Sequence, residues 1–280
     1  MTARARIESL LRGEGAAPAF VPLVEPLAPR LAGCSYPAMI ADASAWSAGV
    51  LQSAKLLGAD ALCVGFDIDL AVEACRSSME APETQGGFAV LVDTAGRLFD
   101  TQRGKFGCVV ALCGPATLAA RLAPGQPEKE ALSAVKATLN RLLEALCRHR
   151  PDLVVFMEAA DAVSATPSAD LRRAYATLRK VAAYYGIASG LHASGGVALS
   201  ALGCEVLFQE RAEAPPTEGW RAVVTPLPTN IEAARTACTE LLAARRPGGP
   251  AIGFGLSDLS DAADLEAVRS VRAAIETIAA

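Results

Sequence analysis

The sequence predicts a single (β/α)8 barrel of the TIM type spanning residues 1–280, and three observations support this prediction. A chain of 280 residues has the length of one such domain. Hydrophobic residues make up 52% of the chain, which is enough for a large core. Short apolar runs alternate with longer Ala-rich stretches of helical period, a pattern typical of parallel strands joined by crossover helices.

Eight apolar runs rich in Val, Leu and Phe are predicted to form the strands of the barrel. In chain order they are Phe20 to Val24, Ala61 to Asp67, Val109 to Cys113, Leu153 to Glu158, Ser189 to His192, Glu205 to Phe208, Ala222 to Pro226 and Ala251 to Phe254. Eight parallel strands, each followed by a helix, are what a closed barrel of this type requires.

Apolar residues three and four apart predict helices between the strands, each with one stripe toward the barrel. The clearest stripes are Leu132, Val135, Leu139, Leu142 and Leu146, and later Leu265, Val268, Val271 and Ile275. Capping side chains or prolines at residues 35–37, 166–167 and 229–230 mark predicted helix starts.

Two connections depart from this alternation. Residues 76–107 show no long helical pattern, and the run Phe88 to Val92 followed by residues 94–97 predicts a hairpin on the rim. Residues 211–220 are few and include two adjacent prolines, so no full helix is expected between the sixth and seventh strands.

Composition excludes several classes of function. The net charge of −4 and 5% aromatic content argue against nucleic-acid binding. Charged residues interrupt every apolar run before the roughly 18 residues of a membrane span, and the start does not resemble a signal peptide. The eight cysteines are dispersed without a Cys-x-x-Cys pair, which indicates buried thiols in a reducing compartment. We therefore expect a cytoplasmic protein.

Polar residues at strand ends are the candidates for chemistry, because barrel active sites form where strands end and loops begin. The set comprises Glu25, Asp67, Asp69, Cys113, Glu158, His192, Ser194, Gln209, Glu210, Thr225, Ser257 and Asp258.

Three of these candidates are predicted to be catalytic. His192 ends an apolar strand before a flexible Ala-Ser-Gly-Gly loop, so its imidazole could move a proton or bind a metal. The other histidine, His149, is expected to be exposed at a helix end. Asp67 and Glu158 each end a buried strand, where burial would disturb the carboxyl pKa. For a metal, His192 is the predicted ligand and Cys113 a further one, since catalytic zinc needs three protein ligands.

Four segments carry a resemblance to a known family. They are residues 58–74, 114–119, 152–167 and 190–195, and in order and spacing the chain resembles the uroporphyrinogen decarboxylase superfamily, closest to its corrinoid-dependent (methylcobalamin:coenzyme M type) methyltransferases. The resemblance covers most of the chain. It implies the same barrel, and a corrinoid as substrate or on a partner protein.

The chain departs from the family pattern at two places. The arginine-rich loop of the decarboxylases corresponds here to residues 25–30, where only Arg30 remains to hold carboxylates. Thiol-methylating members bind zinc through one histidine and two thiolates. His192 matches that histidine, but Ser194 and Phe254 stand at the thiolate positions, which weakens a zinc site.

Three hypotheses of function follow. The leading one is a methyltransferase that moves a methyl group between a small molecule and a corrinoid, the corrinoid residing on a separate protein because the barrel accounts for this whole sequence. Here His192 would position or protonate the leaving heteroatom, while Asp67 and Glu158 would provide charge. The alternatives are a tetrapyrrole decarboxylase or binder, and a catalytically degenerate accessory subunit. The residues expected to bind substrate are Arg30, Tyr36, Gly114, Ser194 and Gln209.

Overall fold

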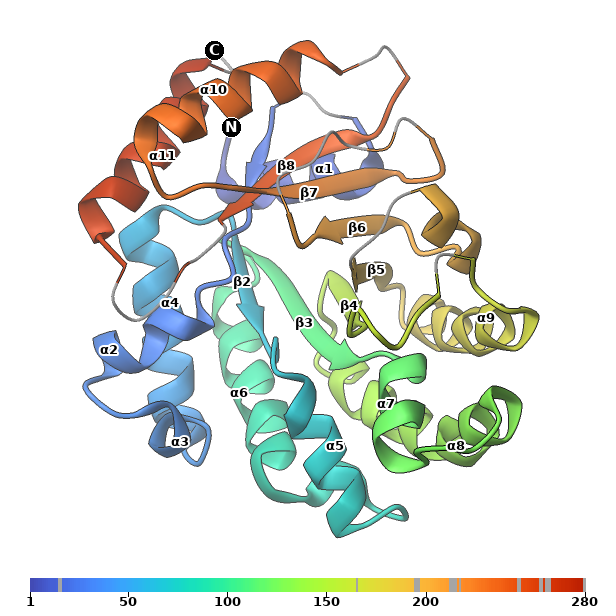
Figure 1. The fold of residues 1–280 in the computed structure, drawn as a ribbon. Helices are drawn as coiled ribbons and strands as arrows, with labels where there is room; N and C mark the ends of the chain where they lie inside the picture. Colours follow the sequence, from blue (N-terminus) through green and yellow to red (C-terminus); the bar gives the residue numbers. More distant parts are fainter. Residues whose placement is uncertain are drawn as a thin grey trace.

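A barrel of eight parallel strands forms the centre of the molecule, as the sequence predicts. The computed structural model describes residues 1–14, 17–164, 166–193, 197–211, 216, 218–245, 248–256, 259 and 263–278. Its strands pair in the order β1-β8-β7-β6-β5-β4-β3-β2 and curl into a nearly closed barrel (Figure 1). The strands are β1 (Ala19–Phe20), β2 (Ala61–Val64), β3 (Gly107–Cys113), β4 (Leu153–Met157), β5 (Ala188–Ala193), β6 (Val206–Gln209), β7 (Ala222–Leu227) and β8 (Ala251–Leu256).

Helices surround this barrel. They are α1 (Ala3–Arg12), η1 (Glu25–Leu27), α2 (Ala28–Ala32), α3 (Tyr36–Met39), α4 (Ala43–Leu57), α5 (Ile68–Ser77), η2 (Pro82–Thr84), α6 (Gly86–Gln102), α7 (Pro115–Leu122), α8 (Glu128–Cys147), α9 (Ala169–Tyr184), η3 (Val197–Leu202), α10 (Ile231–Ala243) and α11 (Leu265–Ile278). No described helix has both the length and the apolar character that a membrane crossing requires.

The predicted helix signals are largely confirmed. All five residues of the α8 stripe are buried, and in α11 three of the four are. Ser35 caps α3 and Asn230 caps α10, each accepting a backbone N–H. Helix α9 begins slightly later than predicted, because Ser168 rather than Thr166 is its N-cap. All eight cysteines are free thiols and seven are buried, as the sequence indicates.

The predicted hairpin at residues 88–97 is wrong, because this segment lies within helix α6. Phe88, Leu91, Ala95 and Leu98 are buried on one face of that helix. Their spacing of three and four residues is helical, and it outweighs the strand-like run of apolar residues. In the connection at 211–220, residues 212–215 and 217 lie outside the described part, and the described ones form no helix.

Helix α1 covers the barrel at the amino ends of its strands. Ile7 and Leu10 belong to the core inside the barrel, and Ile7 packs against Gly107 at the start of β3. Arg6 forms two hydrogen bonds with the buried Asp60, at 2.9 and 2.6 Å. Asp60 also joins β1 to β2. Its backbone N–H donates to the Phe20 carbonyl, and its carboxylate accepts the Phe20 N–H, each at 2.8 Å. In the part of the chain that the structure describes, no strand pairing joins β1 directly to β2, and we call this place the seam of the barrel.

Successive residues of each strand face opposite layers, which decides what reaches the site. On β4, Leu153, Val155 and Met157 belong to the core inside the barrel. Val154 and Phe156 belong to the layer between the barrel and its helices. Met157 therefore ends the strand facing the barrel mouth.

Candidate active site

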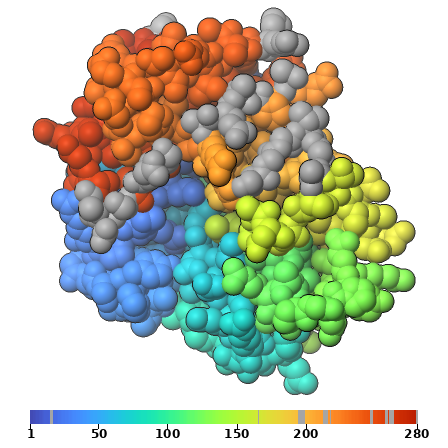
Figure 2. Space-filling view, viewed as in Figure 1, coloured from blue at the N-terminus to red at the C-terminus, as the bar shows by residue number. Residues whose placement is uncertain are grey.

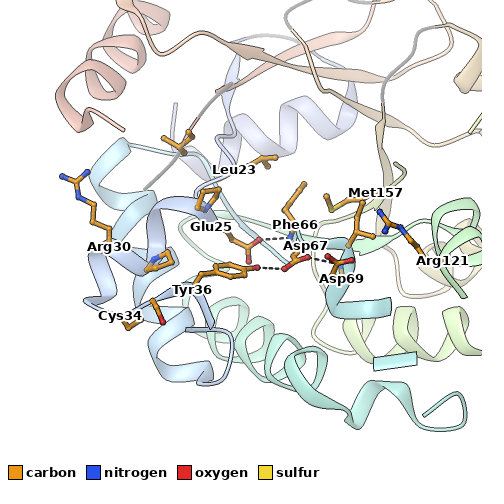
Figure 3. A pocket seen from close by; sticks show the side chains of 15 residues that line it. Leu23, Glu25, Arg30, Cys34, Tyr36, Phe66, Asp67, Asp69, Arg121 and Met157 are labelled. Carbon is orange, nitrogen blue, oxygen red and sulfur yellow. Dashed lines mark hydrogen bonds between the residues drawn. The ribbon is translucent and has the colours of Figure 1, made fainter. Parts of the chain in front are cut away.

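A large cavity of about 1010 Å³ opens at the carboxyl end of the barrel, where active sites of this fold lie (Figure 3). In the space-filling view, the segments that carry α2, α3, α5 and α7 gather around this end (Figure 2). We call this space the main cavity. It is lined by Leu23, Glu25, Pro26, Pro29, Arg30, Cys34, Ser35, Tyr36, Phe66, Asp67, Ile68, Asp69, Arg121, Met157 and Leu259.

Glu25 organises the wall of the main cavity from a buried position. Its Oε1 accepts hydrogen bonds from Trp46 Nε1 at 2.9 Å and from the Gly65 backbone N–H at 2.8 Å. Its Oε2 accepts the Phe66 N–H at 2.7 Å. Burial raises the pKa of Glu25 to about 7, although the three N–H donors oppose this shift. The carboxyl group thereby fixes the turn that leads from β2 into α5.

Gly65 is required in that turn. Its φ of +83° lies in the left-handed region, and an added Cβ would meet Ala111 O and Leu91 at 2.9 Å. Only glycine lets the backbone turn so tightly that Phe66 and Asp67 both enter the main cavity.

Tyr36 and Asp67 form the central polar pair of the main cavity. Tyr36 Oη donates to Asp67 Oδ2 at 2.8 Å, and Asp67 Oδ1 caps α5 by accepting the Asp69 N–H at 2.9 Å. Burial raises the pKa of Tyr36, and the charge of Glu25 adds to the effect, so the phenol stays protonated as a donor. Both residues were predicted as site residues, and the structure brings them together.

Charged side chains face the main cavity from several elements. Arg30 reaches it from α2 and donates to Ala263 O at 3.1 Å. Asp69 and Arg121 line it from α5 and α7, and within the described part of the chain neither side chain forms a hydrogen bond or an ion pair. The cavity therefore presents both signs of charge to a ligand.

His192 faces a second, smaller cavity of about 210 Å³ beside the main one. Gln209 lines it as well, and Leu23 lines both cavities, so they adjoin. The ring of Phe66 packs edge-on against the imidazole at 6.3 Å between centroids. Burial lowers the pKa of His192, while Glu210 opposes the shift. Its imidazole is thus uncharged near neutral pH. Gln209 itself accepts a hydrogen bond from Thr225 Oγ1 at 2.6 Å.

Glu158 lies elsewhere, behind the barrel wall. Following the outward-facing Phe156, it points away from the barrel and lines neither cavity. Its oxygens accept the N–H groups of Ala116 and Thr117 at 3.1 and 2.8 Å. They also accept the Thr117 and Tyr175 hydroxyls at 2.6 and 2.7 Å. Burial raises its pKa. This arrangement anchors the start of α7 and does not place the carboxyl group beside His192 or Asp67.

Gly114 belongs with Glu158 rather than with a substrate. A Cβ on Gly114 would lie 2.3 to 2.8 Å from the Glu158 carboxyl atoms, so the absence of a side chain lets the acid reach α7. Gly114 was predicted to bind substrate, but among the described residues it lines neither the main cavity nor the smaller one.

Cys113 and His192 are not brought together as metal ligands. Cys113 packs in the outer layer, lines neither cavity, and burial raises the pKa of its thiol. Phe254 also belongs to the outer layer. Within the described ranges, no group of three His, Cys, Asp or Glu side chains is arranged to hold a metal ion. A zinc site built on His192 and Cys113 does not fit these positions. Ser194, also predicted, lies outside the described residues.

Sequence reasoning missed two features of the site. The sequence places Glu25 among the strand-end candidates but assigns it no role. The apolar residues around it do not indicate that three N–H groups donate to its carboxyl group. Arg121 was not a candidate at all, because it lies two helical turns beyond the end of β3. The short α7 nevertheless places it at the main cavity. His149, predicted to be exposed, is half-buried against Gly96.

No protein family and no curated protein matches the chain. The structure is similar to a methyltransferase from Methanosarcina mazei, with a TM-score of 0.76, 16% identity and coverage of 100% of both chains. It is also similar to a B12-independent methionine synthase from Shewanella sp. W3-18-1, with a TM-score of 0.47, 12% identity, and coverage of 67% of this chain and 66% of that chain. At such identities the first likeness shows the fold, and the second adds nothing to it.

Proposed function

We propose that this protein is a methyltransferase that moves a methyl group between a small molecule in the main cavity and a corrinoid. The observation that carries the proposal is the match along the full length of both chains to a protein described as a methyltransferase. The polar pair of Tyr36 and Asp67 in the main cavity, with an uncharged histidine in the adjoining smaller cavity, adds support. The corrinoid, free or on a partner protein, is the second substrate.

Methyl transfer needs little covalent chemistry from the protein. The methyl carbon breaks its bond to one partner as it bonds the other, and the leaving partner keeps the electron pair. The protein must hold both partners in line and keep water away. The Asp67 carboxylate and the Tyr36 oxygen offer acceptors that orient the heteroatom of the small molecule, since the Tyr36 proton is donated to Asp67. His192, uncharged in the adjoining cavity, would accept the proton that a thiol or amine loses when it takes up the methyl group.

The charges of the main cavity also permit a second candidate. Arg30 and Arg121 both line it, and two guanidinium groups suit a tetrapyrrole with several carboxylates. In that case the protein would bind a porphyrinogen and either release CO2 from it or only carry it.

One set of measurements separates these candidates. The protein is titrated with methylcobalamin in the dark and, separately, with a porphyrin carboxylate, and bound pigment is measured by equilibrium dialysis. We expect saturable binding of methylcobalamin, and its demethylation when a thiol or amine acceptor is added, as followed by absorbance. His192→Gln should slow demethylation, whereas His149→Gln at the opposite end of the barrel should not. Binding of the porphyrin alone would overturn the methyltransferase proposal, and binding of neither pigment would favour an accessory role.

A further inference from the structure

Two opposite charges face the main cavity without a partner in the described structure. Asp69 lies at the start of α5 and Arg121 in the last turn of α7, and neither side chain makes a hydrogen bond or ion pair there. By contrast, Asp67 already binds Tyr36 and the Asp69 N–H. Both residues are exposed, so water solvates their charges in the free protein, and a ligand that enters the cavity can replace that water.

The surroundings of the acidic side suit a bulky cation. Asp67 and Asp69 share this part of the main cavity with the rings of Tyr36 and Phe66, and Met157 lies close by (Figure 3). Aromatic rings together with carboxylates attract an alkylated cation, which is poorly hydrated and needs no hydrogen-bond acceptor.

We propose that the small molecule is a zwitterionic methyl donor, with a methylated ammonium or sulfonium head at Asp69 and Asp67 and a carboxylate that binds Arg121. This inference rests on the proposed function and names its substrate class. The guanidinium of Arg121 is suited to bind a carboxylate through two parallel hydrogen bonds.

The chemistry of an onium donor fits the groups at the site. The C–N or C–S bond breaks, its electron pair stays on the nitrogen or sulfur, and the methyl carbon bonds the reduced corrinoid of the proposed reaction. The leaving group departs as a neutral amine or sulfide, so no acid is required. This agrees with His192, whose imidazole is uncharged near neutral pH and therefore a poor proton donor.

Binding of three probes, measured by calorimetry without corrinoid, tests the proposal. The probes are trimethylammonioacetate, its uncharged-head isostere 3,3-dimethylbutanoate, and choline, which keeps the head but lacks the carboxylate. We expect trimethylammonioacetate to bind roughly ten-fold more tightly than either analogue. Equal affinity for the isostere, or no saturable binding of the zwitterion, would overturn the proposal.

Two variants assign the charges. Asp69→Asn should weaken trimethylammonioacetate by roughly ten-fold and leave 3,3-dimethylbutanoate unaffected, whereas Arg121→Gln should weaken trimethylammonioacetate and leave choline unaffected. Neither side chain bonds the rest of the described protein, so both variants should keep the wild-type melting temperature. If both variants bind the zwitterion as the wild type does, the site is wrong.

The methylcobalamin titration keeps the two proposals separate. A protein that binds corrinoid but not the zwitterion retains the proposed function and contradicts this inference. A protein that binds the zwitterion but no corrinoid retains the ligand site and contradicts the proposed methyl transfer.

Discussion

The hydroxyl of Tyr36 lies 2.8 Å from the Asp67 carboxylate and connects two segments that are separate along the chain. Tyr36 begins α3, which with α2 forms an excursion between β1 and α4. Asp67 follows β2 and caps α5. One hydrogen bond therefore ties this excursion to the barrel wall across the main cavity, and it orients the carboxylate that we assign to the substrate.

Replacing Tyr36 with Phe should remove this bond while keeping the ring. We expect the rate of methyl transfer to fall by roughly ten-fold, because Asp67 loses the donor that orients it, and the free energy of unfolding to fall by about 1 kcal/mol. Demethylation of methylcobalamin and urea denaturation measure the two effects. Tyr184→Phe is the matched control, since Tyr184 is exposed on α9. A Tyr36→Phe rate equal to that of the control would remove the pair from the mechanism.

The buried carboxyl group of Glu25 should make stability depend on pH. Its pKa is raised from 4.5 to about 7, so the folded protein keeps this proton over a range in which the unfolded chain releases it. The stabilisation is complete below about 4.5 and is lost as the pH rises through about 7. The free energy of unfolding is measured for the wild type and for Glu25→Gln across this pH range. As the pH rises, the difference in favour of the wild type should shrink by an amount on the order of 3 kcal/mol.

Glu73→Gln serves as the control for that comparison. Glu73 is exposed on α5, so its curve should run parallel to that of the wild type. If the Glu25→Gln and Glu73→Gln curves have the same slope, Glu25 is ionised throughout and its three N–H donors outweigh burial.

His192 should titrate below its ordinary pKa of 6.5, because burial disfavours the imidazolium ion. The chain has two histidines, so the NMR signal missing in His192→Gln identifies the residue. Since the unfolded chain takes up this proton more readily, His192 should also lower stability as the pH falls below 6.5. A measured value at or above 6.5 would show that Glu210 outweighs burial, and it would restore His192 as a proton donor.

The contact of Gly114 with Glu158 predicts a strict requirement for glycine. Gly114→Ala should destabilise the protein by about 1–3 kcal/mol, since its Cβ would overlap the carboxyl group. Gly104→Ala is the control, because nothing lies within 4 Å of a Cβ there. Thermal melting compares the two, and equal melting temperatures would mean that Glu158 moves aside at no cost.

The sequence predicted the barrel well because its strands are buried on both sides and read as continuous apolar runs. The hairpin prediction at residues 88–97 was wrong for the same reason, since a short apolar run does not distinguish a strand from one face of a helix. Only the wider spacing from Phe88 to Leu98 shows the helix.

The site was harder to predict, because a strand end can face either way. Met157 and Glu158 are neighbours, yet one faces the barrel mouth and the other supports α7. The sequence shows both as strand-terminal residues. Tyr36 and Asp67 meet across 31 positions, a contact that depends on how the excursion folds back. Local spacing carries no information about such a contact.

The seam at Asp60 has a consequence for the order in which the chain acquires its shape. Asp60 contacts Arg6, 54 residues away, and Arg272, 212 residues away. Among the described residues, the carboxylate that joins β1 to β2 thus receives its counter-charges from α1 and α11 together. During synthesis, the early strands must wait for α11 to leave the ribosome before this joint is complete. We expect the barrel to close last at the seam between β1 and β2, with the loss of chain entropy concentrated in that step.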